Sequence, residues 1–127
     1  MKIKKLLKDI EKRSKEIEDK HPESKFLDIE HFKSVKDKEA YHITIQFELT
    51  YDKDILAEIF SKKADDVASI KPNIGFDFDL DYYTDEHVYY TLDEVFNQYI
   101  SWLNTLEDSY KSYSRTHKDS KISNYLR

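Results

Sequence analysis

The chain contains one long segment, residues 41–51, in which apolar and polar residues alternate strictly. Because successive side chains of a strand point to opposite faces, this segment predicts a strand that is buried on one face only. A second alternation covers residues 74–82, and its polar positions include three aspartates, Asp77, Asp79 and Asp81. We expect these aspartates to form a row on the polar face of a second strand.

A third predicted strand covers residues 26–35, where the pattern is mixed. Leu27 and Ile29 are expected on one face of this strand. The opposite face would carry Phe26, Asp28 and Glu30. The polar residues 36–39 then predict a turn that joins this strand to the next one as a hairpin.

The segment after the aspartates predicts a second hairpin and then a long helix. Residues 84–87 are polar and residues 88–90 favour a strand, which together indicates a turn followed by a fourth strand. Thr91 and Glu94 have the spacing of a capping box, so the helix is expected to begin there. Its apolar residues recur at helical spacing as far as Tyr113.

Two further helices are predicted earlier in the chain. Residues 3–20 carry apolar side chains at three- and four-residue steps, and Pro22 ends this pattern. Another helix is expected after Asp52, because an aspartate can cap the free amide groups of a first helical turn. We place the end of that helix between Lys63 and Ser69, where the apolar pattern decays.

These elements give the order α-β-β-α-β-β-α. Strands and helices are grouped rather than alternating singly, which predicts an α+β fold with an antiparallel four-stranded sheet covered by helices on one face. Residues 1–113 are expected to form a single domain. Residues 114–127 are rich in Ser, Lys, Arg, His and Asn, so we expect a flexible basic C-terminal tail.

The composition narrows the range of possible functions. The chain has no cysteine and a single glycine, which excludes disulfides, thiolate-bound metals and the glycine-rich loops that hold phosphates. No cofactor is therefore expected. The Lys-rich first residues lack the apolar run of a signal peptide, and no stretch is long and apolar enough to span a membrane. We predict a cytoplasmic protein that has no membrane partner.

The net charge of −5 is distributed unevenly along the chain. Residues 39–109 carry 4 Lys or Arg and 16 Asp or Glu, whereas the segments on both sides have a basic balance. A block this acidic repels nucleic acid phosphates and attracts basic protein surfaces. The chain is therefore expected to bind a basic protein partner, such as a nuclease, and not to bind nucleic acid directly.

The predicted row of aspartates is the main candidate for this contact. Side chains two residues apart on a strand lie roughly 7 Å apart, close to the spacing of successive phosphates along a nucleic acid strand. Tyrosine favours protein interfaces because it combines rigid area with a polar tip. The predicted partner-binding residues are Asp77, Asp79, Asp81, Tyr83, Asp85, Glu86 and Tyr89. The alternative is that the aspartates only form the solvated half of a half-buried strand.

A metal site is not predicted from the same row. The spacing of Asp77, Asp79 and Asp81 matches the opening of a calcium loop, but Tyr82 stands where that loop needs glycine. Val88 stands where the closing glutamate is needed. No metal ligands are therefore assigned.

These observations favour a non-enzymatic protein that inhibits a nucleic-acid-binding partner by charge mimicry. Phage antagonists of bacterial defence nucleases share this size and charge. Three alternatives remain open: an immunity protein that neutralises a bacterial toxin, a structural or assembly protein, and a small enzyme. The enzyme would use His42, Glu48 and Asp79, if the sheet brings these side chains together as an acid/base cluster.

Overall fold

The computed structural model describes residues 3–33, 40–61, 70–79 and 83–125, and it describes side chains as far as residue 115. Within these residues the order of elements is α-β-β-α-β-α. The elements are α1 (Ile3–Lys20), β1 (Ser24–Lys33), β2 (Ala40–Leu49), α2 (Lys53–Phe60), β3 (Asn73–Asp79) and α3 (Asp85–Tyr125).

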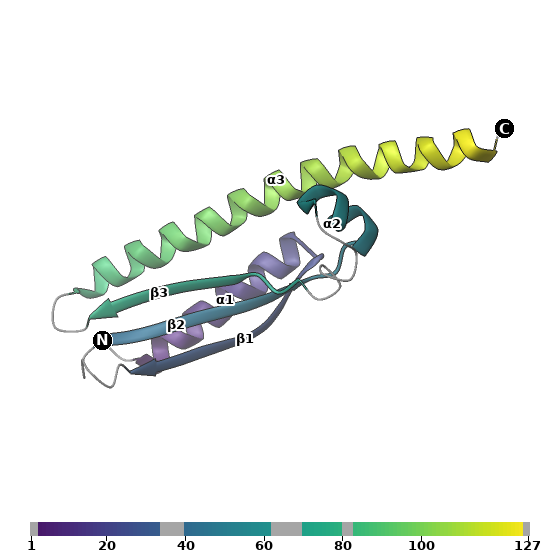
Figure 1. Cartoon of the computed structure of the whole chain (residues 1–127). Helices are drawn as coiled ribbons and strands as arrows, with labels where there is room; N and C mark the ends of the chain where they lie inside the picture. The colour runs from purple at the N-terminus through teal and green to yellow at the C-terminus, as the bar shows by residue number, and fades with distance from the viewer. Residues whose placement is uncertain (1–2, 34–39, 62–69, 80–82, 126–127) are drawn as a thin grey trace.

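The predicted α+β class and the antiparallel sheet are confirmed, but the described residues form three strands and not four. The strands lie in the order β1-β2-β3, and both neighbouring pairs are antiparallel. In Figure 1 the strands lie in front, α1 passes behind them and α3 runs along the same length of the sheet. The fold is therefore a sheet layer and a helix layer.

The central strand β2 separates the two faces of the sheet as its alternating pattern predicts. Ile43, Ile45, Phe47 and Leu49 are buried, while the residues between them are only half-buried. In β3 the same alternation buries Ile74, Phe76 and Phe78. The apolar side chains of both strands face the helix layer, where they join one core with the apolar faces of α1 and α3. The other face of the sheet carries the polar residues.

The predicted assignment of faces in β1 is wrong at its start. The pairing with β2 shifts between Phe26 and Asp28, which leaves Leu27 as an extra residue in a β-bulge. Phe26 therefore lies opposite Phe47 on the buried side, and Leu27 is 41% exposed. Beyond the bulge, Ile29 faces the core and Asp28 faces outward, as predicted.

The predicted fourth strand at residues 88–90 is also wrong, because these residues belong to the first turns of α3. The side chain of Thr84 caps the helix, since its Oγ1 accepts a hydrogen bond of 3.1 Å from the amide of His87. Val88 is buried and begins the apolar stripe of α3 one turn before Leu92. The turn predicted at residues 84–87 is thus a helix start, and the capping box expected at Thr91 is not used.

The ends of the other two helices are set locally. α2 ends at Phe60, earlier than predicted, because Ser61 adopts the left-handed conformation that terminates helices. Residues 62–69 lie outside the described residues. The helix α3 continues through residues 114–125, so the backbone of the predicted tail is helical, and the flexibility of that tail stays a prediction.

Aromatic rings connect the two layers of the fold. The ring of Phe47 on β2 stacks on Tyr99 of α3 with centroids 4.6 Å apart. Phe26 of β1 packs edge-on against the Phe47 ring. The hydroxyl of Tyr99 is hydrogen-bonded to Ser24 Oγ at 2.7 Å, which satisfies both polar groups in the core. Burial raises the pKa of Tyr99 to about 12, since ionisation would place a charge in the apolar layer. These contacts of Tyr99 fix the position of α3 on the sheet.

A pair of phenylalanine substitutions tests the assignment of the two faces. Phe47→Ala removes a fully buried ring, so we expect it to lower the free energy of unfolding by about 3–5 kcal/mol. Phe32→Ala removes a ring that is 60% exposed on the other face, and its cost should stay below about 1 kcal/mol. Denaturant unfolding of both variants measures the difference, and equal losses would contradict the assignment.

Two threonine substitutions test where α3 begins. Thr84→Ala removes the cap and should cost about 1 kcal/mol of stability. Thr91 Oγ1 donates to the carbonyl of His87 one turn earlier in the same helix, so Thr91→Ala should cost close to nothing. A larger loss for Thr91→Ala in thermal unfolding would indicate that the helix begins at the later threonine.

Candidate functional site

The face of the sheet that points away from α1 and α3 is covered by no helix in the described part of the chain. Its side chains alternate with the buried ones on all three strands, apart from the bulge in β1. We call it the outer sheet face. It consists of Lys25, Asp28, Glu30 and Phe32 on β1, His42, Thr44, Gln46 and Glu48 on β2, and Asn73, Gly75, Asp77 and Asp79 on β3.

The described residues of the outer sheet face include five carboxylates and one lysine. The lysine, Lys25, lies opposite Glu48 at one end. Asp28 and Glu30 form a row on β1, and Asp77 and Asp79 form a second row on β3. Carboxylates within a row are roughly 7 Å apart, and the rows are separated by two strand spacings, roughly 10 Å. β2 contributes neutral Thr and Gln between them.

One polar contact crosses the outer sheet face between β2 and β3. His42 lies opposite Asp77 in register, and its Nδ1 is hydrogen-bonded to the Asp77 carboxylate. On the other side, the ring of Phe32 stacks on the His42 ring with centroids 4.8 Å apart. This arrangement fixes the His42 ring across the sheet. The Asp77 side chain is still 70% exposed, so it remains open to a partner.

The structure brings only part of the predicted site together. Asp77 and Asp79 lie on the outer sheet face, as expected for a row on β3. Asp81 lies outside the described residues. Tyr83 follows the strand, and its amide donates to the carbonyl of Asp79 at 2.9 Å. Its half-buried ring packs against the core and stacks on His87. Tyr83 therefore helps to hold the segment that connects β3 to α3.

Asp85 and Glu86 occupy the first turn of α3 and are exposed. Carboxylates at this position interact favourably with the free amides and the positive end of the helix dipole. These positions therefore stabilise the start of α3. They adjoin the end of β3 in the chain, so they extend the acidic character of that end of the molecule.

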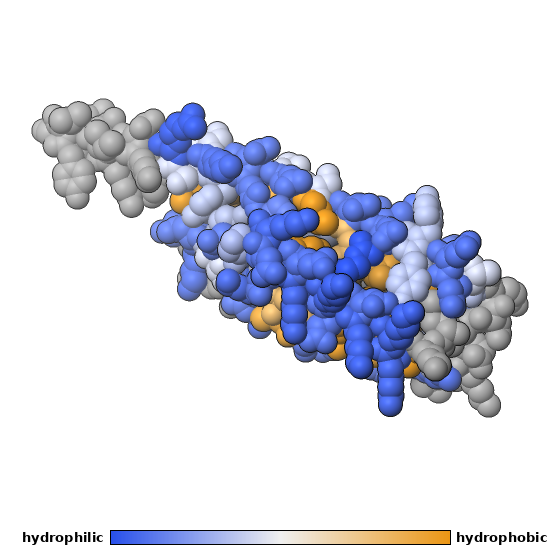
Figure 2. Space-filling model, turned by 180° about the vertical axis from the view of Figure 1, so that it is seen from behind, coloured by the Kyte–Doolittle hydropathy of each residue, from blue (hydrophilic) through white to orange (hydrophobic). Residues whose placement is uncertain are grey.

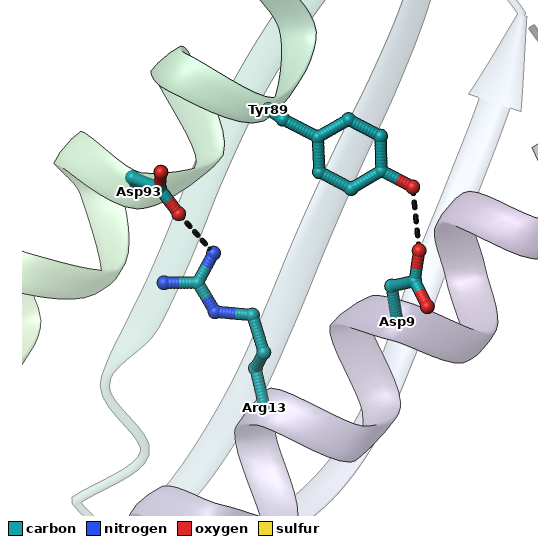
Figure 3. Close-up of polar contacts among 4 residues, drawn as sticks. All are labelled: Asp9, Arg13, Tyr89 and Asp93. Atoms are coloured by element: carbon teal, nitrogen blue, oxygen red, sulfur yellow. Dashed lines mark hydrogen bonds and ion pairs between the residues drawn. The ribbon is translucent and has the colours of Figure 1, made fainter. Parts of the chain in front are cut away.

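Tyr89 does not belong to the outer sheet face, because it lies in the helix layer and faces α1. Its hydroxyl donates to the Asp9 carboxylate at 2.5 Å (Figure 3). One turn away, Arg13 of α1 bonds to Asp93 of α3 at 2.5 Å, and the two contacts show that the helices run side by side in the same direction. The hydrogen bond to Asp9, followed by partial burial, raises the pKa of Tyr89 to about 12.

The helix side of the described molecule is mainly hydrophilic (Figure 2). Figure 2 shows the molecule from behind the view of Figure 1, and hydrophilic side chains cover most of that side with small hydrophobic patches between them. Lysines and glutamates alternate along α1, and Lys15 pairs with Glu11 at 2.8 Å. Such mixed charges are typical of a solvated helix face.

The acid/base cluster considered for an enzyme does not form. His42 and Glu48 share the outer sheet face but lie at opposite ends of β2, about 20 Å apart by strand geometry. His42 is hydrogen-bonded to Asp77, which lies directly opposite it in register. Across the described residues, no three carboxylate or imidazole groups come close enough to hold a metal ion.

The sequence reasoning missed Asp28 and Glu30 as candidate site residues. The row of Asp28 and Glu30 does not stand out along the chain, because β1 and β3 are separated by residues 34–72 and share one face only through β2. The signal that could have found them is the hairpin between residues 26 and 49. Pairing its strands places Asp28 opposite Gln46 and Glu30 opposite Thr44, on the polar face.

Comparison with known proteins finds no relative of this chain. No family model matches the chain, and no curated protein and no solved structure matches it. A search for spans that could cross a bilayer finds none among the described helices, since none combines the required length with apolar character.

The contact between Tyr89 and Asp9 predicts a pH-dependent contribution to stability. Tyr89→Phe should lower the free energy of unfolding by about 1 kcal/mol, because it removes one hydrogen bond between the helices. The pKa of Tyr89 is raised by folding, so this contribution is complete below pH 10 and is lost as the pH rises through about 12. Unfolding of both proteins along this pH range measures the effect. A constant difference between them would contradict the assigned contact.

Proposed function

We propose that this protein is a non-enzymatic inhibitor that binds a basic protein through the outer sheet face. The observation that supports the proposal is the placement of Asp28, Glu30, Asp77 and Asp79 on a face that no described helix covers. A partner that approaches this face meets carboxylates from both edge strands. The groove of a nuclease or other nucleic-acid-binding protein, which is lined by Lys and Arg for phosphates, has the complementary charge.

The sheet supports such a role because it holds the charges at fixed positions. Their backbone is held in the sheet by strand pairing, and the opposite face of the sheet is anchored by Phe47 and Tyr99 in the core. Carboxylates that are already in place lose little conformational entropy when a partner binds. A rigid acidic face also steers a basic partner at long range and speeds the encounter.

Charge mimicry of nucleic acid is the specific form of the proposal. Within each edge strand the carboxylates repeat roughly every 7 Å, which is the spacing considered above for a phosphate backbone. The two rows are offset along the sheet, since Asp28 and Glu30 lie level with Asn73 and Gly75. A defence nuclease and a nuclease toxin present the same kind of basic groove, so both partner classes fall within the proposal. We place the interaction in the cytoplasm.

The proposal is tested by neutralising the carboxylates of the outer sheet face and measuring inhibition of DNA cleavage by a panel of purified bacterial nucleases. The variant combines Asp28→Asn, Glu30→Gln, Asp77→Asn and Asp79→Asn. We expect the wild-type protein to inhibit at least one nuclease, with an affinity that falls as salt rises. The variant should bind at least about tenfold more weakly, a loss of about 1.4 kcal/mol.

A matched control removes the same number of charges from the helix layer. It combines Glu16→Gln, Asp19→Asn, Glu94→Gln and Asp108→Asn, all at exposed positions of α1 and α3. This control should inhibit as well as the wild-type protein. Equal weakening of both variants would show that net charge matters and that the outer sheet face does not, and inhibition of no nuclease would reject this partner class.

A further inference from the structure

The strand β3 is an edge of the sheet, with β2 on one side only. The amides of Phe47 and Leu49 on β2 donate to the carbonyls of Pro72 and Ile70, each at 3.0 Å. Because backbone groups alternate along an antiparallel strand, the even-numbered residues face β2. The amides and carbonyls of Asn73, Gly75 and Asp77 therefore point to the open edge, where no described strand pairs with them.

A groove lies beside this edge, between β3 and α3. Its volume is about 380 Å³, and it is lined by residues 72–75 and by Val95, Gln98, Tyr99 and Trp102. The Trp102 side chain is 37% exposed although it is large and hydrophobic. A strand added at the edge would thus lay its inward-facing side chains in a groove of mixed polarity whose wall includes Val95 and Trp102.

Gly75, the only glycine of the chain, lies in the middle of the edge strand and lines the same groove. The fold does not require glycine here: its φ is not positive, and an added Cβ would meet only the carbonyl oxygen of Ile43 at 3.8 Å, an ordinary contact. Glycine weakens a strand by roughly 0.5–1 kcal/mol relative to alanine. In strand interiors it often marks a place where another backbone approaches closely.

We propose that an extended basic segment of the partner adds to the free edge of β3 as a further strand. Its backbone pairs with Asn73, Gly75 and Asp77, and its alternate apolar side chains enter the groove beside Trp102. Its remaining side chains, Lys or Arg, lie on the outer sheet face beside Asp77 and Asp79. This inference rests on the proposed function, because it specifies how the basic partner is held.

Charge favours such a partner over a second copy of this chain. The outward side chains of β3 include two aspartates, and like charges placed side by side on neighbouring strands are destabilising. A second copy would bring the same aspartates to the edge and offer no complement. Charged side chains on an edge strand commonly prevent pairing between identical copies. A basic segment instead gains from both the backbone pairing and the charge.

The experiment uses a short peptide that alternates lysine and valine as the probe. Amide hydrogen exchange by NMR should show slower exchange at Asn73, Gly75 and Asp77 when this peptide is added to the full chain. The control peptide has the same sequence and charge, with its amides methylated on the edge that would pair. We expect it to give no protection, because its N-methyl groups cannot donate to the carbonyls of the edge and also hold its backbone too far away to accept from the three amides.

Two substitutions separate strand addition from simple charge attraction. Gly75→Pro removes an amide that points to the open edge and does not pair with β2, so the fold should tolerate it, but peptide binding should weaken at least about tenfold. The double change Asp77→Asn and Asp79→Asn should weaken binding of both peptides. Equal binding of the two peptides, without protection of the three amides, would overturn strand addition while leaving the acidic inhibitor intact.

Two further outcomes would also overturn the inference. Absence of binding by either peptide would show that the edge does not accept a basic strand, even if the nuclease assay succeeds. Protection of the same amides in the protein alone, increasing with its concentration, would show that a second copy occupies the edge.

Discussion

The packing of one face of the sheet against α1 and α3 is the constraint on which the rest of the structure depends. Phe47 lies at its centre, stacked on Tyr99 and fully buried. The chain has a low apolar fraction of 39%, so aromatic side chains supply much of the buried area. The apolar side chains of the described helices cover one face of the three-stranded sheet. The other face carries polar side chains, and it is the face for which we propose a partner.

The outer sheet face and the open edge of β3 are exposed for one reason: among the described elements, α1 and α3 both pack on the opposite face of the sheet. The helices α1 and α3 lie beside one another on the buried face, joined by Arg13 with Asp93 and by Asp9 with Tyr89. The polar face and the β3 edge are left without a described neighbour. The edge strand has the groove beside Trp102 on one side and carboxylates on the other, so it presents two chemically different surfaces. A basic, alternating segment is the ligand that we propose for both.

The parts of the fold that the sequence predicts are those set by local periodicity. The strict alternation in residues 41–51 and the row of Asp77 and Asp79 identify strands with one buried face, because the pattern alone decides their orientation. The start of α3 was placed too late because Tyr89 and Tyr90 favour strands, while the buried contacts of Val88 and the cap from Thr84 decide the outcome.

The candidate site could be predicted only in part because it is assembled across strands. Asp28 and Glu30 reach the outer sheet face through the register of β1 on β2, and the bulge after Phe26 interrupts the pattern that would have revealed it. Its nearness to the aspartates in sequence predicts that Tyr89 lies on the same surface. The helical start at residue 85 instead rotates its side chain toward Asp9.

The most direct test of this account is hydrogen–deuterium exchange of the protein in complex with a nuclease that it inhibits. We expect protection in β3, at residues 73–79, in β1 around Asp28 and Glu30, and in the neighbouring part of α3 around Trp102. The exposed faces of α1 should exchange as in the free protein. Protection confined to α1 and the N-terminal half of α3, with β3 unchanged, would contradict the assignment of the binding surface to the sheet.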